Sequence, residues 1–117
     1  IKNVYEKCGE RFLKRVYSNE EISYFLSKSN ALSIAGSMAV RFAAKEAFAK
    51  AIGIGIREGI NLRDINIDVD KKGKPYLKLE GKCKNIIIEL GITAMHLTLS
   101  HTHKYANAVV ILECENV

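Results

Sequence analysis

The sequence lacks any long hydrophobic run, and this absence excludes a membrane-spanning helix. Crossing a bilayer takes roughly 18 consecutive apolar residues, and no stretch of the 117 residues approaches that length. The opening IKNVYEKCGERFLKR is charged throughout and has no apolar segment of the kind that a signal peptide needs. We therefore expect a cytoplasmic protein.

Cysteine is scarce too, and its spacing argues against the sites that depend on it. Cys8, Cys83 and Cys114 are odd in number, lie far apart and form no CxxC pair. We therefore expect reduced thiols, with neither a structural zinc site nor a disulfide framework. Linkers, repeats and low-complexity tracts are also missing, while 48% of the residues are hydrophobic. Residues 1–117 are predicted to form one compact domain.

The charge balance is basic, with a formal net charge of +5 and a pI near 9.2. A basic surface favours acidic partners, which include nucleic acid, anionic lipid, phosphorylated ligands and acidic proteins. The net charge therefore favours an acidic partner but does not distinguish among these four kinds.

The spacing of apolar residues predicts helices in the first half of the chain. A helix is expected over residues 1–16, with residues at a spacing of four on its apolar face: Val4, Cys8, Phe12 and Val16. Ser18 is the predicted N-cap of a second helix, with acidic residues in its first turn and these apolar ones on its face: Ile22, Phe25 and Leu26. A long alanine-rich helix follows over 31–52, and Gly53 is placed to end it.

The second half alternates in the manner of strands. INIDVD (65–70) and YLKLE (76–80) flank the turn KKGKP and predict a hairpin. AMHLTLS (94–100) predicts a third strand, and YANAVVILE (105–113) a fourth that is buried. Residues 82–90 fit a helix face or a strand, and the glycines that bracket them favour a helix. The fold class is therefore α+β, with a small, mainly antiparallel sheet packed on a long central helix.

The long helix carries two pairs of charged residues at a spacing of four. Glu46 and Lys50 share one face, and an exposed ion pair is the favoured interpretation from spacing alone. Arg41 and Lys45 are both cationic and would repel each other, unless an anion lies between them. A carboxylate beside cations also suits Mg²⁺, which bridges carboxylate and phosphate oxygens. The pattern indicates a phosphate ligand.

Three loop segments offer weaker signals. GIGIREG (53–59) lacks the GK[ST] of a phosphate-binding loop, so a helix stop and loop is predicted there. The lysines of DKKGKP (70–75) are either solvated surface or a means of steering an anion. LSHTHKY (99–105) is either a polar hairpin turn, the favoured interpretation, or a set of hydroxyl and imidazole donors for a phosphate. Two histidines without a third ligand are weak evidence for a metal.

The order of these segments carries more information than any one of them. RFAAKEAFAKAIG, then GKPYL, then HLTLSHTHKYANAVVI resembles the holo-acyl-carrier-protein synthase family of 4′-phosphopantetheinyl transferases, over about residues 11–112. The motif F-x-x-K-E-A-x-x-K-A is matched by Phe42, Lys45, Glu46, Ala47, Lys50 and Ala51. The motif S-H-T-x-x-Y-A is matched by Ser100, His101, Thr102, Tyr105 and Ala106.

The resemblance implies an activity. Members of the family transfer the phosphopantetheine arm of coenzyme A to a serine of apo-acyl carrier protein and release 3′,5′-ADP. The reaction requires Mg²⁺ and supports fatty acid biosynthesis. Its rate acceleration comes mostly from positioning the substrates and neutralising charge. It also implies a homotrimer with active sites between subunits, and no nucleic acid or membrane partner.

The resemblance assigns roles to individual residues. Glu46 would be a magnesium ligand, and Lys50 would contact the transferring phosphate, which makes these two the catalytic pair. The coenzyme A contacts would come from the following residues, the last three of them supplied by a neighbouring subunit: Arg41, Lys45, Gly73, Lys74, Pro75, Ser100, His101 and Thr102. Arg11 would meet the acidic acyl carrier protein.

The sequence departs from the family at two places. The family opens with a strand reading G-I-D-I, whose aspartate is the other magnesium ligand, and the printed sequence begins after that point. Since Ile1 is not a methionine, we expect this strand to precede it in the whole protein. Cys8 occupies a position that is often basic in relatives.

Two other functions remain open at this level. A small basic α+β domain could bind RNA, although no aromatic pair on adjacent strands and no GXXG clamp is visible. A non-catalytic domain that binds coenzyme A is the other alternative.

Overall fold

The computed structural model describes residues 2–53, 59–102 and 104–114, with side chains from residue 9 onward. Within these ranges three helices come first, followed by two strands, a fourth helix and two more strands, which agrees with the predicted α+β class. The elements are α1 (Lys2–Val16), α2 (Asn19–Leu26), α3 (Ala31–Ala51), the 3₁₀ turn η2 (Leu62–Asp64), β1 (Ile65–Val69), β2 (Pro75–Leu79), α4 (Gly81–Glu89), β3 (Ile92–His101) and β4 (Ala106–Cys114).

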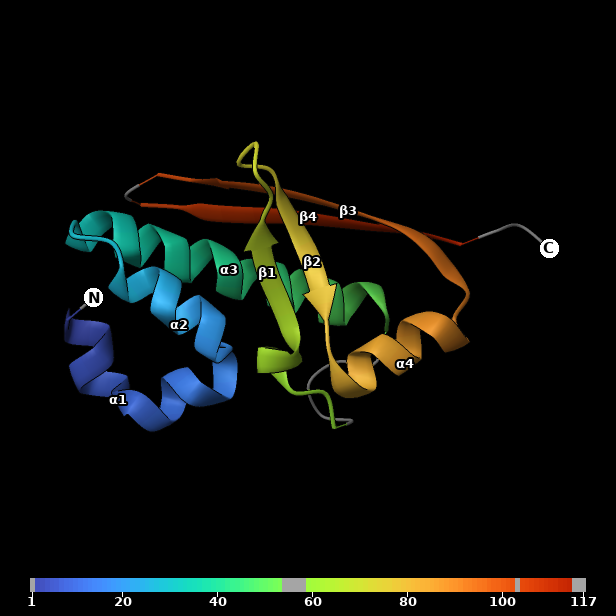
Figure 1. The fold of residues 1–117 in the computed structure, drawn as a ribbon, viewed down its shortest axis with the longest axis horizontal. Helices are drawn as coiled ribbons and strands as arrows, with labels where there is room; N and C mark the ends of the chain where they lie inside the picture. Colours follow the sequence, from blue (N-terminus) through green and yellow to red (C-terminus); the bar gives the residue numbers. More distant parts are fainter. Residues whose placement is uncertain (1, 54–58, 103, 115–117) are drawn as a thin grey trace.

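The α3 helix is the central element, and both of its predicted ends are confirmed. The Asn30 side chain caps its start by accepting from the backbone N–H groups of Leu32 and Ser33 at 2.9 and 3.2 Å. At the other end Gly53 has a φ of +76°, the left-handed conformation that stops helices. Figure 1 shows α1 and α2 gathered at one end of α3 and α4 near the other.

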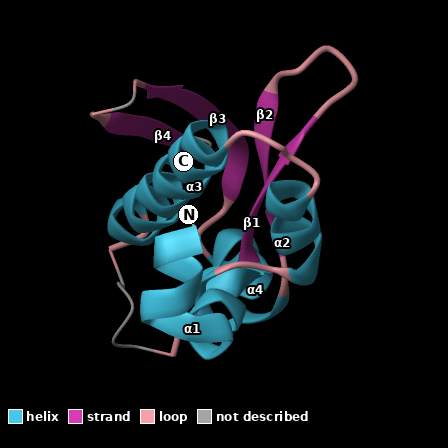
Figure 2. Cartoon of the chain, turned by 90° about the vertical axis from the view of Figure 1, so that its left-hand side faces the viewer, coloured by secondary structure: helices cyan, strands magenta, loops and turns pink. Residues whose placement is uncertain are grey.

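The strands pair as two antiparallel hairpins. In β1–β2, Ile65 is opposite Leu79, and in β3–β4, Leu97 is opposite Val110. The long β3–β4 hairpin runs beside α3, and β1–β2 crosses them (Figure 1). Seen from the end, the β1–β2 turn projects away from the body of the molecule (Figure 2). The segment around 82–90, ambiguous in sequence, is the helix α4.

A single hydrophobic core lies between α3, the two hairpins and the short helices. Its members share an exposed fraction of 9% or less, and the central ones are Leu13, Val16, Phe25, Phe48, Ile65, Ile67, Cys83, Ile86 and Leu97. Alanines 44 and 49 of α3 are also buried, so this helix approaches its neighbours closely.

Two of the predicted apolar faces are wrong in part, and one is that of α2, where Leu26 is 66% exposed while Phe25 is buried. In α1, Phe12 is 39% exposed, whereas Leu13 and Val16 are buried. Val16 shares its buried face with Leu13, three residues before it, and not with Phe12, four residues before it. Gly9, with a φ of 72° and a ψ of 166°, interrupts the helical phase ahead of all three. The side chains of Val4 and Cys8 lie outside the described residues.

The fourth strand is not the buried strand that its composition predicts. Val109 and Ile111 of β4 are 54% and 53% exposed, because only the alternate side chains of the hairpin face α3. Among the helices that the structure describes, none combines the length and the apolar character that crossing a bilayer requires.

Candidate active site

Helix α3 places its four charged side chains in two different surroundings. Arg41 and Lys45 are on the side that faces α2 and β1, and both are buried. Glu46 is half-buried and Lys50 is exposed. A step of one residue turns an α-helix by about 100°, so adjacent Lys45 and Glu46 point in different directions.

The ammonium group of Lys45 is fully buried and uses all three of its donors within the chain. It donates to Glu21 Oε1 at 2.7 Å, to the Leu62 carbonyl at 3.0 Å and to the Ile65 carbonyl at 2.6 Å. Burial lowers the pKa of Lys45, and the negative charge of Glu21 opposes that shift. All three donors of the ammonium are thus satisfied by the chain itself, and the contact of Lys45 with a phosphate of coenzyme A stays a prediction.

Arg41 lies beside the same carboxylate. Its Nε is 4.0 Å from Glu21 Oε2, its Nη1 donates to Ser37 Oγ at 3.3 Å, and the guanidinium stacks 4.5 Å from the Tyr24 ring centre. The anion inferred between Arg41 and Lys45 is therefore the chain's own Glu21. Sequence reasoning missed this role because Glu21 lies 24 residues before Lys45 and was already explained as one of the acidic residues in the first turn of its helix.

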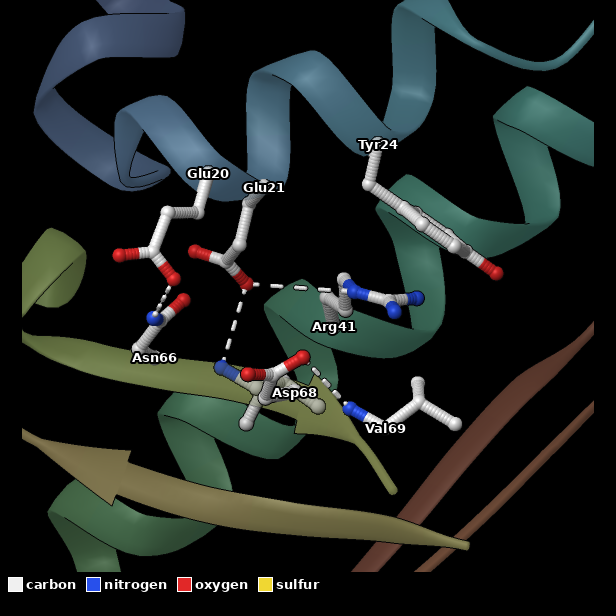
Figure 3. A pocket seen from close by; sticks show the side chains of 8 residues that line it. Glu20, Glu21, Tyr24, Arg41, Asn66, Asp68 and Val69 are labelled. Carbon is white, nitrogen blue, oxygen red and sulfur yellow. Dashed lines mark hydrogen bonds and ion pairs between the residues drawn. The ribbon is translucent and has the colours of Figure 1, made fainter. Parts of the chain in front are cut away.

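A pocket of about 170 Å³ opens beside Arg41, between α2 and the edge of β1 (Figure 3). Three carboxylates line it with Arg41: Glu20, Glu21 and Asp68. Arg41 Nε is buried without a hydrogen-bond partner among the described atoms. Three acidic groups surround the single guanidinium, so a phosphate in this pocket would also face their negative charge. The assignment of Arg41 to coenzyme A phosphates stays a prediction.

Glu46 and Lys50 differ from Arg41 and Lys45, which lie buried beside Glu21. The predicted ion pair between them does not form, and neither side chain has a hydrogen bond or ion pair with any other described residue. As far as the described residues go, the carboxylate and the ammonium are therefore available to a ligand. No group of three or more metal-ligating side chains exists among the described residues. A lone carboxylate nevertheless suits Mg²⁺, which keeps several waters and takes its remaining oxygens from substrate phosphates.

The Ser100–His101–Thr102 segment lies at the end of β3, against the first half of α3. A Cβ built on Gly36 would come within 2.5 Å of the His101 ring. Thr102 Oγ1 orders the turn by accepting from the backbone N–H groups of Lys104 and Tyr105 at 3.2 and 3.1 Å. A hollow of about 170 Å³ lies beside this turn, lined by Leu32, Ala35, Gly36, Ala39, Thr102, Lys104, Tyr105 and Ala106. His103 lies outside the described residues.

The chain does not bring this segment to Glu46 and Lys50. Gly36 and Glu46 are ten residues apart on one helix, which corresponds to about 15 Å along its axis. The same helix therefore carries two separate candidate half-sites, one at each end.

The GKP turn joins β1 and β2 at the projecting tip (Figures 1 and 2). Asp70 Oδ1 accepts from the backbone N–H groups of Lys72 and Lys74 at 2.9 and 2.8 Å, and Gly73 has a φ of +86°. The turn is thus well defined, with Gly73 and Lys74 exposed and Pro75 half-buried as the first residue of β2.

Arg11 is exposed on α1, next to the exposed ring of Phe12. An apolar hollow begins at Phe12 and continues over Met38 and Phe42 of α3. The basic side chain therefore borders an apolar surface, an arrangement typical of protein interfaces.

Comparison with known proteins adds independent findings. Residues 1–110 match the sequence profile of the 4′-phosphopantetheinyl transferase superfamily. The chain is 43% identical over 113 residues to a holo-[acyl-carrier-protein] synthase of Halothermothrix orenii, which covers 97% of this chain and 87% of that protein. Among solved structures, a holo-[acyl-carrier-protein] synthase of Neisseria meningitidis is similar with a TM-score of 0.82 at 34% identity, covering 96% of this chain and 87% of the other. The Helicobacter pylori synthase, solved in complex with coenzyme A, has a TM-score of 0.78 at 29% identity over 97% and 90% of the two chains.

Proposed function

Because this chain belongs to the 4′-phosphopantetheinyl transferase superfamily, we propose that it transfers the 4′-phosphopantetheine arm of coenzyme A to a serine of apo-acyl carrier protein. Its similar relatives are holo-[acyl-carrier-protein] synthases, so the chain is an enzyme of that kind. The proposal includes release of 3′,5′-ADP, dependence on Mg²⁺, a cytoplasmic location and a role in fatty acid biosynthesis.

The observation that carries the proposal is that Glu46 and Lys50 lack a partner in the part of the chain that the structure describes. Both side chains are one helical turn apart, and no described residue engages either of them. Glu46 would hold Mg²⁺, which would neutralise charge on the pyrophosphate of coenzyme A. Lys50 would place its ammonium on the transferring phosphate, where negative charge develops as the serine oxygen attacks and the ADP oxygen leaves.

The nucleotide end of coenzyme A would be held by residues of a neighbouring subunit. The separation of about 15 Å along α3 between the two half-sites supports this arrangement, because Ser100, His101 and Thr102 of one chain are remote from its own Glu46. The proposed assembly is a homotrimer, in which the GKP turn, Gly73 to Pro75, would form part of the adenine-side wall.

The carrier protein would dock on α1. Acyl carrier proteins are acidic, and the chain has a net charge of +5. Arg11 is an exposed cation beside an apolar surface, so it would steer and orient that partner.

The test is transfer itself. The protein is incubated with apo-acyl carrier protein, coenzyme A and Mg²⁺, and the carrier is weighed by mass spectrometry. We expect a gain of about 340 Da, the mass of the phosphopantetheine group carried by the cofactor, together with one 3′,5′-ADP per carrier. Coenzyme A binding without any gain in mass would overturn the enzymatic proposal and favour a non-catalytic coenzyme A binder. RNA binding without coenzyme A binding would favour the nucleic-acid alternative.

A further inference from the structure

The buried cation of α3 connects four elements of the fold. Through its three hydrogen bonds, Lys45 joins α3 to Glu21 of α2, to the η2 turn at Leu62 and to β1 at Ile65. Its side chain is 0% exposed, and that of Glu21 is 1% exposed. Water therefore does not compete for these bonds, and each would be costly to leave unmade.

The carboxylate of Glu21 also accepts several hydrogen bonds. Besides Lys45, its carboxylate accepts from the backbone N–H of Ser18 at 3.0 Å and of Ile67 at 3.4 Å. The first bond closes the capping box that starts α2, since Ser18 Oγ in turn accepts from the Glu21 N–H. The carboxylate thus ties α2 to the edge of β1 on the side where α3 arrives, as Figure 3 shows for Glu21 and its neighbours.

This network controls where α3 points its next residue. Glu46 follows Lys45 directly, and Lys50 lies one turn beyond Glu46. Since neither has a partner among the described residues, their positions depend on the rotation and axial placement of α3 itself. A small rotation of α3 would break the three buried hydrogen bonds of Lys45, whereas the surrounding alanines and aliphatic side chains have no comparable directional preference.

We propose that Lys45 and Glu21 are positioning residues for the transfer reaction, which hold α3 in the orientation that aims Glu46 and Lys50 at the phosphates. This inference rests on the proposed function. It replaces direct contact between Lys45 and coenzyme A by an indirect role through the backbone of α3. Buried ion pairs are often no more stabilising than hydrophobic pairs of the same volume, so a geometric role gives this pair a purpose that stability alone does not.

The decisive variant is the double substitution Glu21→Gln/Lys45→Met. It removes both charges of the hydrogen-bonded pair and keeps the side-chain lengths. Arg41 loses the carboxylate 4.0 Å from its Nε but keeps its hydrogen bond to Ser37 and its stacking on Tyr24. We expect kcat to fall roughly 10- to 100-fold, the loss that follows a misplacement of about 1 Å in an active site. The KM for coenzyme A stays within about twofold of the original because Lys45 does not touch the substrate. The Mg²⁺ concentration for half-maximal rate rises, since Glu46 is displaced.

A second variant keeps the inference testable if the double variant does not fold. Glu21→Asp retains the charge and the cap but shortens the carboxylate by one methylene, so it cannot reach Lys45 in the same geometry. Circular dichroism confirms folding at the assay temperature, and we expect the same fall in kcat at unchanged KM, to a smaller degree. Lys84→Met, which removes an exposed ammonium from α4, is the control, and its kcat and KM should equal those of the original protein.

A folded double variant, or a folded Glu21→Asp, with the original kcat and Mg²⁺ dependence would overturn the inference. A raised KM for coenzyme A at unchanged kcat would overturn it as well, in favour of direct contact. Failure of the proposed function looks different: the unsubstituted protein would then transfer nothing to the carrier, with or without these substitutions.

Discussion

The ring of His101 on β3 lies against the bare Cα of Gly36 on α3. A Cβ at Gly36 would come within 2.5 Å of both Cε1 and Nδ1, closer than such atoms approach in proteins. Glycine in a helix interior costs about 1 kcal/mol relative to alanine. Gly36 therefore lowers the stability of α3 in order to leave room for an imidazole that we place in the nucleotide half-site.

The first prediction concerns this contact. Gly36→Ala displaces the His101 ring by a rotation of its side chain, since the clashing atoms are at the end of a flexible group. We expect weaker binding of coenzyme A by calorimetry, while the free energy of unfolding stays the same or rises by up to about 1 kcal/mol. A protein destabilised by several kcal/mol would show that the backbone had to move instead.

A double-mutant cycle shows whether the effect passes through the imidazole. His101→Ala alone should weaken coenzyme A binding, and adding Gly36→Ala to it should change nothing further. Additive effects of the two substitutions on coenzyme A binding would show that Gly36 acts independently of the His101 ring.

The second prediction concerns the metal ligand. Glu46→Gln keeps the shape of the side chain and removes the charge that holds Mg²⁺, so we expect Mg²⁺-dependent transfer to be lost. The fold should survive, because no described residue depends on the carboxylate. Glu89→Gln on α4 is the matched control, as it removes an exposed carboxylate far along the chain. An active Glu46→Gln variant with normal Mg²⁺ dependence would exclude Glu46 from the metal site.

The third prediction concerns the carrier protein. Arg11→Glu reverses an exposed charge at the edge of the apolar hollow, and we expect KM for apo-acyl carrier protein to rise by roughly fivefold, equivalent to about 1 kcal/mol. The increase should shrink at high salt, and KM for coenzyme A should not change. Lys84→Glu makes the same charge reversal on α4. If it raises KM for the carrier equally, total charge and not a docking position governs the encounter.

The fourth prediction concerns alkaline stability. The Tyr17 hydroxyl donates to the Met38 carbonyl at 2.6 Å, and burial, with a smaller effect from Glu21, raises the pKa of Tyr17 above its usual value of 10. The unfolded chain therefore loses this proton near pH 10 while the native protein keeps it. The contribution of Tyr17 is fully present below pH 10 and is lost as pH rises above that value.

Urea unfolding of the original protein and of Tyr17→Phe measures this directly. Near pH 8 the original protein should be more stable by about 1 kcal/mol, the usual value of one hydrogen bond. Above pH 10 the difference should shrink, by up to about 1.4 kcal/mol per pH unit. Lys45 is present in both proteins, so the effect of its titration cancels when their free energies of unfolding are compared. The remaining difference reports on the Tyr17 hydroxyl. A difference that stays constant to pH 11 would contradict the assignment.

Local patterns were sufficient wherever neighbours along the chain decide the structure. The Ser18 cap, the long α3 helix, its stop at Gly53 and the β1–β2 hairpin all depend on contacts within a few residues. Patterns failed where a single backbone torsion or a distant element intervenes. Gly9 shifts the phase of α1, and the face of β4 that carries Val109 and Ile111 is left exposed by the packing of its hairpin.

The charged pairs of α3 show the limit most clearly. By itself the sequence determined that Arg41 and Lys45 require an anion, because two cations one turn apart repel each other. It also determined the family, through three motifs in one order. Only the tertiary structure decided that the anion is Glu21, brought from α2 into a dry interior where a charge must have a partner. It likewise decided that Glu46 and Lys50 have no described partner within the chain, because the helix that buries Lys45 on one side turns the next residue toward another.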